Sequence, residues 1–199
     1  MESLGQAYPA TFEVDRAERI ANWRPLVQWL LALPHFLILY GLQLVARAAA
    51  VIGWFAILFT GKLPEGLANL LCLYIRYNNR ASAYAGFLRE EYPPFVYDTV
   101  APEPGNYPPV RNGFAPDLGE RNRVTVGFRL ILAIPQIIVV AVLGVAAIIV
   151  WVIALFAVLF TGRWPEGMRT FIVGYMRWVT RLEAYVGLLT DRYPPFSLE

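Results

Sequence analysis

The chain has little cysteine, histidine or charge. Its 199 residues include a single cysteine, Cys72, and a single histidine, His35. This excludes a framework of disulfide bonds within the chain, and it excludes a zinc site built from several Cys and His ligands. Only 16% of the residues are charged, against about 25% in an average globular domain. The net charge of +2 is too small to indicate a nucleic-acid partner.

Catalytic motifs are missing as well. The sequence has no G-x-S-x-G, no P-loop, no H-E-x-x-H, and no pair of carboxylates in apolar surroundings. Its long apolar segments contain no acidic residue, so a carboxylate-driven path for protons or cations has no candidate there. We therefore expect no enzymatic activity, no metal ion and no cofactor.

Apolar residues are abundant instead. They make up 57% of the chain, and the mean hydropathy is +0.46. Two apolar segments, 26–60 and 124–161, are far longer than the about 18 residues that mark a transmembrane candidate. The polar first 24 residues have neither the apolar core nor the cleavage site of a signal peptide. This pattern predicts an all-α integral membrane protein.

The length of the two segments suggests that each one crosses the membrane twice. A single helix over 26–60 would extend about 52 Å, against a hydrocarbon core of about 30 Å. Basic residues flank both segments on both sides, and such flanks favour the cytoplasm. We predict two transmembrane helical hairpins, 26–60 and 124–161, with bends at 43–47 and at Gly144. The alternative is one long span per segment, kinked at Pro34 or Pro135.

An internal duplication is the strongest pattern in the chain. A shift of 101 residues superposes 59–66 on 160–167 with six of eight positions identical. It predicts two membrane repeats of parallel orientation at 20–97 and 121–199. A polar N-terminal tail (1–19) precedes them, and a polar linker rich in proline and glycine (98–120) joins them.

Each predicted hairpin ends in a Phe-Thr-Gly-basic-x-Pro-Glu-Gly turn. Glycine suits a helix C-cap and proline suits the next helix start, so the turn is explained without a ligand. The following segments, 66–90 and 167–191, mix apolar and charged residues. This is typical of amphipathic helices lying in the membrane interface. Their arginines and the turn residues are the predicted contacts to lipid headgroups: Arg76, Arg80, Arg177, Arg181, Lys62 and Arg163.

Six strongly polar side chains interrupt the apolar segments: Gln28, His35, Gln43, Arg47, Arg129 and Gln136. His35, Gln43, Arg47 and Gln136 are the candidates for an intramembrane polar role. An intramembrane histidine can relay protons or ligate haem, but it more often bonds a neighbouring helix. Gln43 and Arg47 either line a path or mark the bend at the far interface. Gln136 takes the place of His35 in the second repeat.

Three motifs carry a resemblance to a known family. They are Tyr-Pro-Ala at 8–10 followed by Glu-Arg at 18–19, the Leu-Ala-Leu-Pro-His run at 31–35, and the Trp-Phe-Ala-Ile-Leu-Phe-Thr-Gly-Lys run at 54–62. The ending at 188–196, with Tyr-Pro-Pro-Phe, adds to them. The chain resembles the DUF4389 family of bacterial, largely actinobacterial, membrane proteins, in two copies over nearly its whole length. The resemblance implies a bacterial origin and a membrane location, and it implies no catalytic residues.

Three functions remain open at this point. The leading hypothesis is a non-enzymatic accessory or scaffold subunit of a larger complex in the bacterial inner (cytoplasmic) membrane. It would be multi-pass, with both termini cytoplasmic. Small residues on its hairpins would pack against a protein partner or a second copy, and its arginines would contact membrane lipids. The alternatives are a lipid-handling or small-solute transport protein, and a protein whose hairpins shape the membrane.

Overall fold

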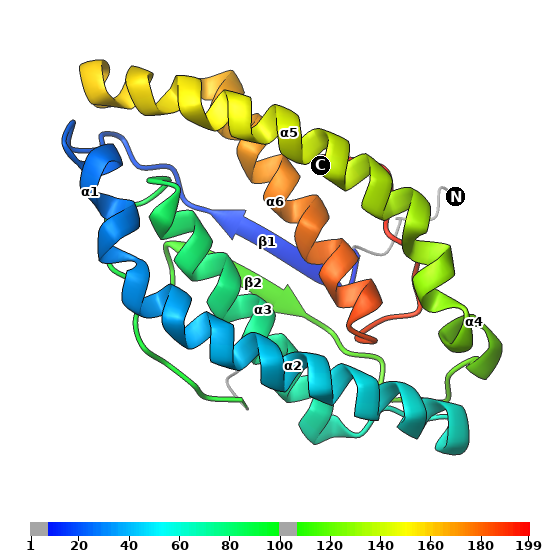
Figure 1. Cartoon of the computed structure of the whole chain (residues 1–199). Helices are drawn as coiled ribbons and strands as arrows, with labels where there is room; N and C mark the ends of the chain where they lie inside the picture. Colours follow the sequence, from blue (N-terminus) through cyan, green and yellow to red (C-terminus); the bar gives the residue numbers. More distant parts are fainter. Residues whose placement is uncertain (1–7, 100–106) are drawn as a thin grey trace, which may run out of the picture.

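The computed structural model describes residues 8–99 and 107–199, and it contains the same series of elements twice (Figure 1). The first series is strand β1 (Ala10–Val14) followed by helices α1 (Arg24–Leu31), α2 (Leu33–Thr60) and α3 (Glu65–Ala85). The second is strand β2 (Val110–Phe114) followed by helices α4 (Arg123–Gly127), α5 (Arg129–Thr161) and α6 (Glu166–Val186). The chain is therefore mostly helical and built from two repeated units, as the sequence predicted.

Each apolar segment contains one long helix and no hairpin, so the predicted bends are wrong. α2 continues through 43–47, and α5 continues through Gly144. A glycine costs a helix only about 1 kcal/mol, which is too little to reverse a chain whose neighbours favour helix. Pro34 lies in the first turn of α2, where its missing N–H is not needed, and Pro135 lies inside α5. Both helices are long and apolar enough to cross a membrane.

The chain reverses after these helices, at the glycines of the repeated turn. Gly61 and Gly162 cap α2 and α5 with φ angles of +80° and +68°. This is the left-handed conformation that glycine adopts without steric cost, so the predicted capping role of the turn is confirmed. The helical hairpins of this fold are therefore α2–α3 and α5–α6.

The two return helices end slightly earlier than predicted. α3 stops at residue 85 and α6 at residue 186, rather than at 90 and 191. The N–H of Leu88 donates to the carbonyl of Ala83 (3.0 Å), and Leu189 makes the equivalent bond to Ala184 (2.9 Å). These bonds reach back five residues, as in a Schellman-type ending, and they close both helices at the same place in each repeat.

A two-stranded antiparallel sheet occupies parts of the predicted tail and linker. β1 and β2 pair from Ala10 opposite Phe114 to Val14 opposite Val110. Alternate residues of β1 point inward, and Phe12 is completely buried. The tail (1–19) and the linker (98–120) are therefore not simply polar connections. Neither strand was expected, because each has five residues and its partner lies about 100 residues away.

The two repeats are related by an approximate two-fold rotation. α2 and α5 run in opposite directions, as two backbone hydrogen bonds show. Ile20, which precedes α1, donates its N–H to the carbonyl of Gly162 at the end of α5 (2.8 Å). Arg121, which precedes α4, donates its N–H to the carbonyl of Gly61 at the end of α2 (2.8 Å). At the centre, the side-chain amide of Asn79 donates to the hydroxyl of Thr180 (2.9 Å). These two residues are equivalent under the 101-residue shift, so their contact lies on the axis. Figure 1 shows α2 and α5 along two edges, α3 and α6 between them, and the sheet behind.

Candidate functional site

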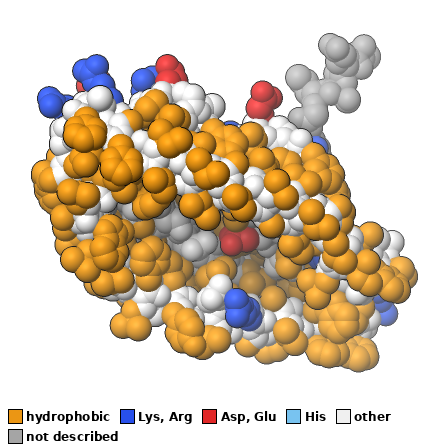
Figure 2. Space-filling view, turned by 45° about the horizontal axis from the view of Figure 1, so that its top comes forward, with side chains coloured by type: hydrophobic (Ala, Val, Ile, Leu, Met, Phe, Trp, Pro, Cys, Tyr) orange, Lys and Arg blue, Asp and Glu red, His pale blue; other side chains and the backbone are white. Residues whose placement is uncertain are grey.

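The exposed apolar side chains are concentrated on α1, α2, α4 and α5, and we call this surface the apolar face. Among the described residues, α3, α6 and the two strands carry no large exposed apolar side chain. Leu37 and Phe59 of α2 and Val142 and Phe160 of α5 are among the most exposed members. Figure 2 shows bands of hydrophobic side chains over this surface, separated by a hollow. Water is a poor solvent for an apolar face of this extent.

The four helix arginines predicted to contact lipid headgroups lie mainly inside the protein. Arg76, Arg80 and Arg181 are buried, and Arg177 is partly buried. Arg177 donates to the carbonyls of Phe12 (3.2 Å) and Leu198 (3.1 Å). Arg76 donates to the carbonyl of Asp98, and Arg181 to that of Ser197. The predicted headgroup role is therefore corrected: the arginine face of α3 and α6 turns toward the strands and terminal segments of the chain.

Lys62 and Arg163 differ from those four, because both side chains are exposed. Each follows the glycine cap of a long helix. Since α2 and α5 run in opposite directions, the two cations lie at opposite ends of the molecule. Both positions are open to headgroup phosphates, and headgroup contact remains the prediction for them.

His35 and Gln136 occupy equivalent, completely buried positions. The Nδ1 atom of His35 lies 2.7 Å from the hydroxyl of Tyr77, and its ring stacks on Phe95. In the second repeat, the indole N–H of Trp178 donates to Gln136 (2.6 Å), which in turn donates to the Pro194 carbonyl. Each polar side chain thus ties a long helix to its return helix and to the Tyr-Pro-Pro-Phe segment. For His35 this is the bonding to a neighbouring helix that the sequence indicated.

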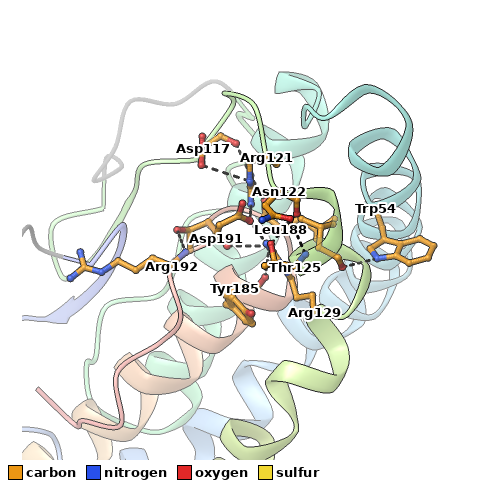
Figure 3. A network of polar contacts seen from close by, with 12 residues as sticks. Trp54, Asp117, Arg121, Asn122, Thr125, Arg129, Tyr185, Leu188, Asp191 and Arg192 are labelled. Carbon is orange, nitrogen blue, oxygen red and sulfur yellow. Dashed lines mark hydrogen bonds and ion pairs between the residues drawn. The ribbon is translucent and has the colours of Figure 1, made fainter.

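A network of arginines and a carboxylate holds the start of α5 (Figure 3). The carboxylate of Asp191 accepts hydrogen bonds from the guanidinium groups of both Arg121 and Arg129. Arg121 also donates to the carbonyls of Asp117 (2.7 Å) and Leu188 (3.1 Å). Burial raises the pKa of the Asp191 carboxyl, but the hydrogen bonds from the two arginines outweigh it, and the net pKa is lowered. The hydrogen bonds of both guanidinium groups go to Asp191 and to backbone carbonyls of the chain itself, so we assign the network a structural role.

Two cavities occupy equivalent places in the two repeats. The first, of about 310 Å³, is lined by α2, α3 and α6, and the second, of about 520 Å³, by α5, α6 and α3. The 101-residue shift superposes their lining: Ala46 on Ala147, Leu71 on Ile172, Tyr74 on Tyr175 and Gly187 on Gly86. Both volumes fall within the about 300–1,000 Å³ typical of small-molecule sites.

Only the first cavity carries charge, and we call it the polar pocket. Arg47 and Glu183 line it, and their equivalents in the second cavity are Ile148 and Ser82. Gln43 also lines the polar pocket, where the second cavity has Gly144. The apolar face is thus interrupted by one site that combines a cation, a carboxyl and an amide.

The polar side chains of this pocket act on one another. The amide of Gln43 donates to the hydroxyl of Tyr74 (3.3 Å). Burial and the Glu183 carboxylate raise the pKa of the Tyr74 phenol, while the Gln43 bond and the Arg47 charge oppose that rise. Glu183 itself has a buried Oε2 atom without a hydrogen-bond partner among the described residues. Burial raises the pKa of this carboxyl to about 7.

Sequence reasoning identified Gln43 and Arg47 but missed Glu183. It considered carboxylates only within the apolar segments, whereas Glu183 lies on the mixed helix α6 and reaches the pocket from the other repeat. A signal did exist, because Arg47 and Glu183 are both charged positions that the 101-residue shift pairs with uncharged residues. Over the described part of the chain, no three His, Cys, Asp or Glu side chains lie close enough to hold a metal ion.

Comparison with known proteins returns one family. A family model described as "Domain of unknown function (DUF4389)" matches residues 22–96 and again residues 123–197. The two matches coincide with the two structural repeats from α1 and α4 onward. No curated protein and no solved structure matches the chain.

Proposed function

Since the chain belongs, in two copies, to the DUF4389 family, whose description assigns no function, we propose one from its geometry: a non-enzymatic membrane protein that handles lipid. The observation that carries this proposal is the distribution of exposed apolar side chains. Most of them lie on α1, α2, α4 and α5, a smaller number lie in connecting and terminal segments such as 92–97, and the described strands and return helices carry none. A surface of this extent suits contact with acyl chains, while the strands and return helices suit contact with water or with the rest of the chain.

We further propose that α2 and α5 lie in the plane of the membrane, rather than crossing it as the predicted multi-pass topology requires. At 28 and 33 residues they extend about 42 and 50 Å, well beyond a hydrocarbon core of about 30 Å. Arg47 stands at the midpoint of α2 and is exposed. In a spanning orientation its charge would lie near the bilayer centre, where a guanidinium costs several kcal/mol.

The path of the chain between the repeats supports the same orientation. The side chain of Gln28 bonds the backbone of Arg89 near the start of α2, and the backbone of Arg121 bonds Gly61 at the end of α2. The two ends of segment 89–121 therefore lie near opposite ends of α2, and the segment contains β2. If α2 crossed a bilayer, the two-stranded sheet with its open edges would lie at membrane depth, where unpaired backbone groups are strongly disfavoured.

The charged side chains of the sheet also support the in-plane orientation. Arg111 of β2 pairs with Glu13 of β1 (3.0 Å) and with Asp15 (2.8 Å), and all three side chains are substantially exposed. These groups favour water. In the in-plane orientation the sheet faces water and the apolar face enters one leaflet, with the approximate two-fold axis along the membrane normal.

The geometry favours lipid handling over the scaffold hypothesis. Small residues of the long helices suggested close packing against a partner, but several of them already pack within the chain. Ala46 is buried in a cluster with Leu71 and Leu188, and Ala147 in a cluster with Ile172. A side chain at Gly53 would meet Leu63 at 2.9 Å. These positions support the return helices, whereas large apolar residues remain exposed.

Membrane fractionation tests this proposal. The full chain should sediment with membranes, resist extraction by alkaline carbonate and be released by detergent. Leu37→Lys combined with Val142→Lys places charges on the apolar face at two well-exposed positions, and we expect it to reduce membrane retention severalfold. The matched control is Thr11→Lys on the exposed side of β1, which should leave retention unchanged. Recovery of the unmodified chain in the soluble fraction without detergent would refute the proposal.

A further inference from the structure

We propose that the polar pocket binds the headgroup of a phospholipid carrying a primary ammonium group, an ethanolamine-type lipid, whose acyl chain follows the apolar groove beside it. This inference rests on the proposed placement of the protein in a membrane and adds a ligand to it. The proposal rests on Glu183 and Arg47, which come from different repeats and bring opposite charges to one cavity.

Glu183 supplies the selectivity for a primary ammonium. The Glu183 side chain lines the pocket, and its Oε2 atom accepts no hydrogen bond from the described residues, so the carboxyl retains unused acceptor capacity. An ethanolamine headgroup carries three N–H donors, whereas a choline headgroup carries none. Burial raises the pKa of this carboxyl to about 7, so a cation beside it shifts the group toward the carboxylate form at neutral pH.

Arg47 supplies the contact to the phosphate. Its side chain is exposed on the long helix and lines both the polar pocket and the adjoining groove. A guanidinium presents several donors to a phosphodiester, and such charge-assisted bonds are among the stronger ones in proteins. Arg47 is the basic residue among those that line the polar pocket.

The adjoining groove suits an acyl chain. It has a volume of about 540 Å³ and runs between α2 and α5, with Trp54 and Leu130 among its apolar lining residues. It meets the polar pocket at Arg47, Ala50 and Val186, which border both. The polar side chains Tyr74 and Glu183 come from α3 and α6, on the side nearer the sheet, while the groove opens between the long helices. A lipid of the surrounding leaflet would therefore sit in its ordinary direction, with headgroup toward water.

The second cavity provides a control within the same chain. It has the same place in its repeat but presents Ile148 and Ser82 instead of Arg47 and Glu183. It lacks the pair of charges that a zwitterionic headgroup requires. Selective binding should therefore occur at one site per chain.

Native mass spectrometry of the full chain in mild detergent tests this assignment. The protein is titrated with dioleoyl phosphatidylethanolamine and, separately, with dioleoyl phosphatidylcholine. We expect one ethanolamine lipid per chain, bound about tenfold more tightly than choline lipid, as one charged hydrogen bond in a buried site provides. Equal binding of the two lipids by the unmodified chain overturns the proposal, whatever the variants do.

Three variants separate the roles. Glu183→Gln should remove the preference for ethanolamine, whereas Arg47→Gln should weaken both lipids about tenfold and keep the preference. Ser82→Ala in the second cavity should change neither, and a loss there equal to that in Glu183→Gln overturns the assignment to the polar pocket. Circular dichroism confirms that each variant keeps its helix content.

Two further outcomes concern the source of the headgroup and the underlying placement. Soluble glycerophosphoethanolamine should compete only weakly, since it has no acyl chain, and competition at the same concentration as the lipid overturns the lipid assignment. If the chain resides in membranes but does not discriminate between the lipids, the pocket proposal fails alone. If the chain is soluble without detergent, the proposed function fails with it.

Discussion

Glu183 is the carboxyl of the polar pocket, and it makes stability depend on pH in a defined direction. Burial raises its pKa in the folded protein to about 7, against an ordinary value of 4.5. The folded state therefore holds this proton more tightly than the unfolded state does. The resulting stabilisation is complete below about pH 4.5 and is lost as the pH rises through about 7.

We expect the unmodified chain to lose on the order of 2 kcal/mol of unfolding free energy, relative to Glu183→Gln, between pH 4.5 and pH 8. Glutamine keeps the shape of the protonated acid and does not titrate. Denaturant unfolding in detergent, followed by circular dichroism, measures the difference. The exposed Glu166→Gln is the matched control and should follow the unmodified chain. Parallel pH profiles for Glu183→Gln and the unmodified chain would contradict the account.

Asp191 is a second carboxyl whose surroundings shift its pKa, but here the pKa is lowered, whereas that of Glu183 is raised. It accepts hydrogen bonds from Arg121 and Arg129, whose side chains are almost completely buried. Asp191→Asn leaves two buried cations without their counter-charge, and we expect a loss of about 2–4 kcal/mol of unfolding free energy. Asp117→Asn removes a longer, half-exposed ion pair to Arg121 and should cost less than about 1 kcal/mol. Equal costs for the two variants would show that the network does not stabilise the start of α5.

At the residue scale, the sequence predicted the unusual positions better than their partners. Gln43 and Arg47 stood out because they interrupt an apolar run, and His35 stood out because it is the single histidine. The partner Glu183 did not stand out, because charges are ordinary on a mixed helix such as α6. The four arginines were misplaced for a related reason. Their spacing shows that they share a helix face, but spacing does not show whether that face meets lipid or the rest of the chain.

At the scale of elements, the two glycine caps are open to a direct test. Gly61 and Gly162 have positive φ angles, which cost a residue with a side chain about 1 kcal/mol. A Cβ atom at Gly162 would also meet the carbonyl oxygen of Ile20 at 3.1 Å, whereas the nearest atom at Gly61 is the tip of Arg123 at 3.5 Å. We therefore expect Gly162→Ala to lower the unfolding free energy more than Gly61→Ala.

Gly41 is the matched control for these substitutions. It lies within α2, and a Cβ atom there meets nothing within 4 Å. Gly41→Ala should raise the unfolding free energy by about 0.5–1 kcal/mol, because alanine favours helix. Thermal unfolding of the three variants gives the order. A neutral effect at Gly162 would show that the turn tolerates another backbone conformation.

The positions of the helices were predictable from the sequence, but the fact that each apolar segment forms one continuous helix was not. Hydropathy located α2 and α5, and the repeated turn located their ends at Gly61 and Gly162. Hydropathy does not report whether an apolar run reverses direction. The prediction of hairpins came from comparing the segment length with the thickness of a membrane, and those hairpins do not form. The strands β1 and β2 were missed because each gains its stability from a partner about 100 residues away.

At the scale of the whole molecule, the 101-residue shift showed that the chain contains two copies but not how they are arranged. The copies pack around an approximate two-fold axis through Asn79 and Thr180. This arrangement depends on contacts between α3, α6 and the strands, and no local sequence pattern predicts these contacts. In the proposed placement, with the axis along the membrane normal, both repeats would face the membrane in the same sense. The multi-pass crossings of the sequence-based prediction are not part of this proposal.

The in-plane placement is the central claim, and the sidedness of two positions tests it most directly. In a Cys72→Ala background, Lys62→Cys and Arg163→Cys each place one thiol at opposite ends of the molecule. Each variant is reconstituted in sealed vesicles, inserted from one side, and treated with a thiol reagent that cannot cross membranes. We predict that both thiols react from the same side, with Thr11→Cys on the sheet reacting there as well. Labelling of Lys62→Cys from one side and Arg163→Cys only from the other would show that α2 and α5 span the membrane and would contradict the account.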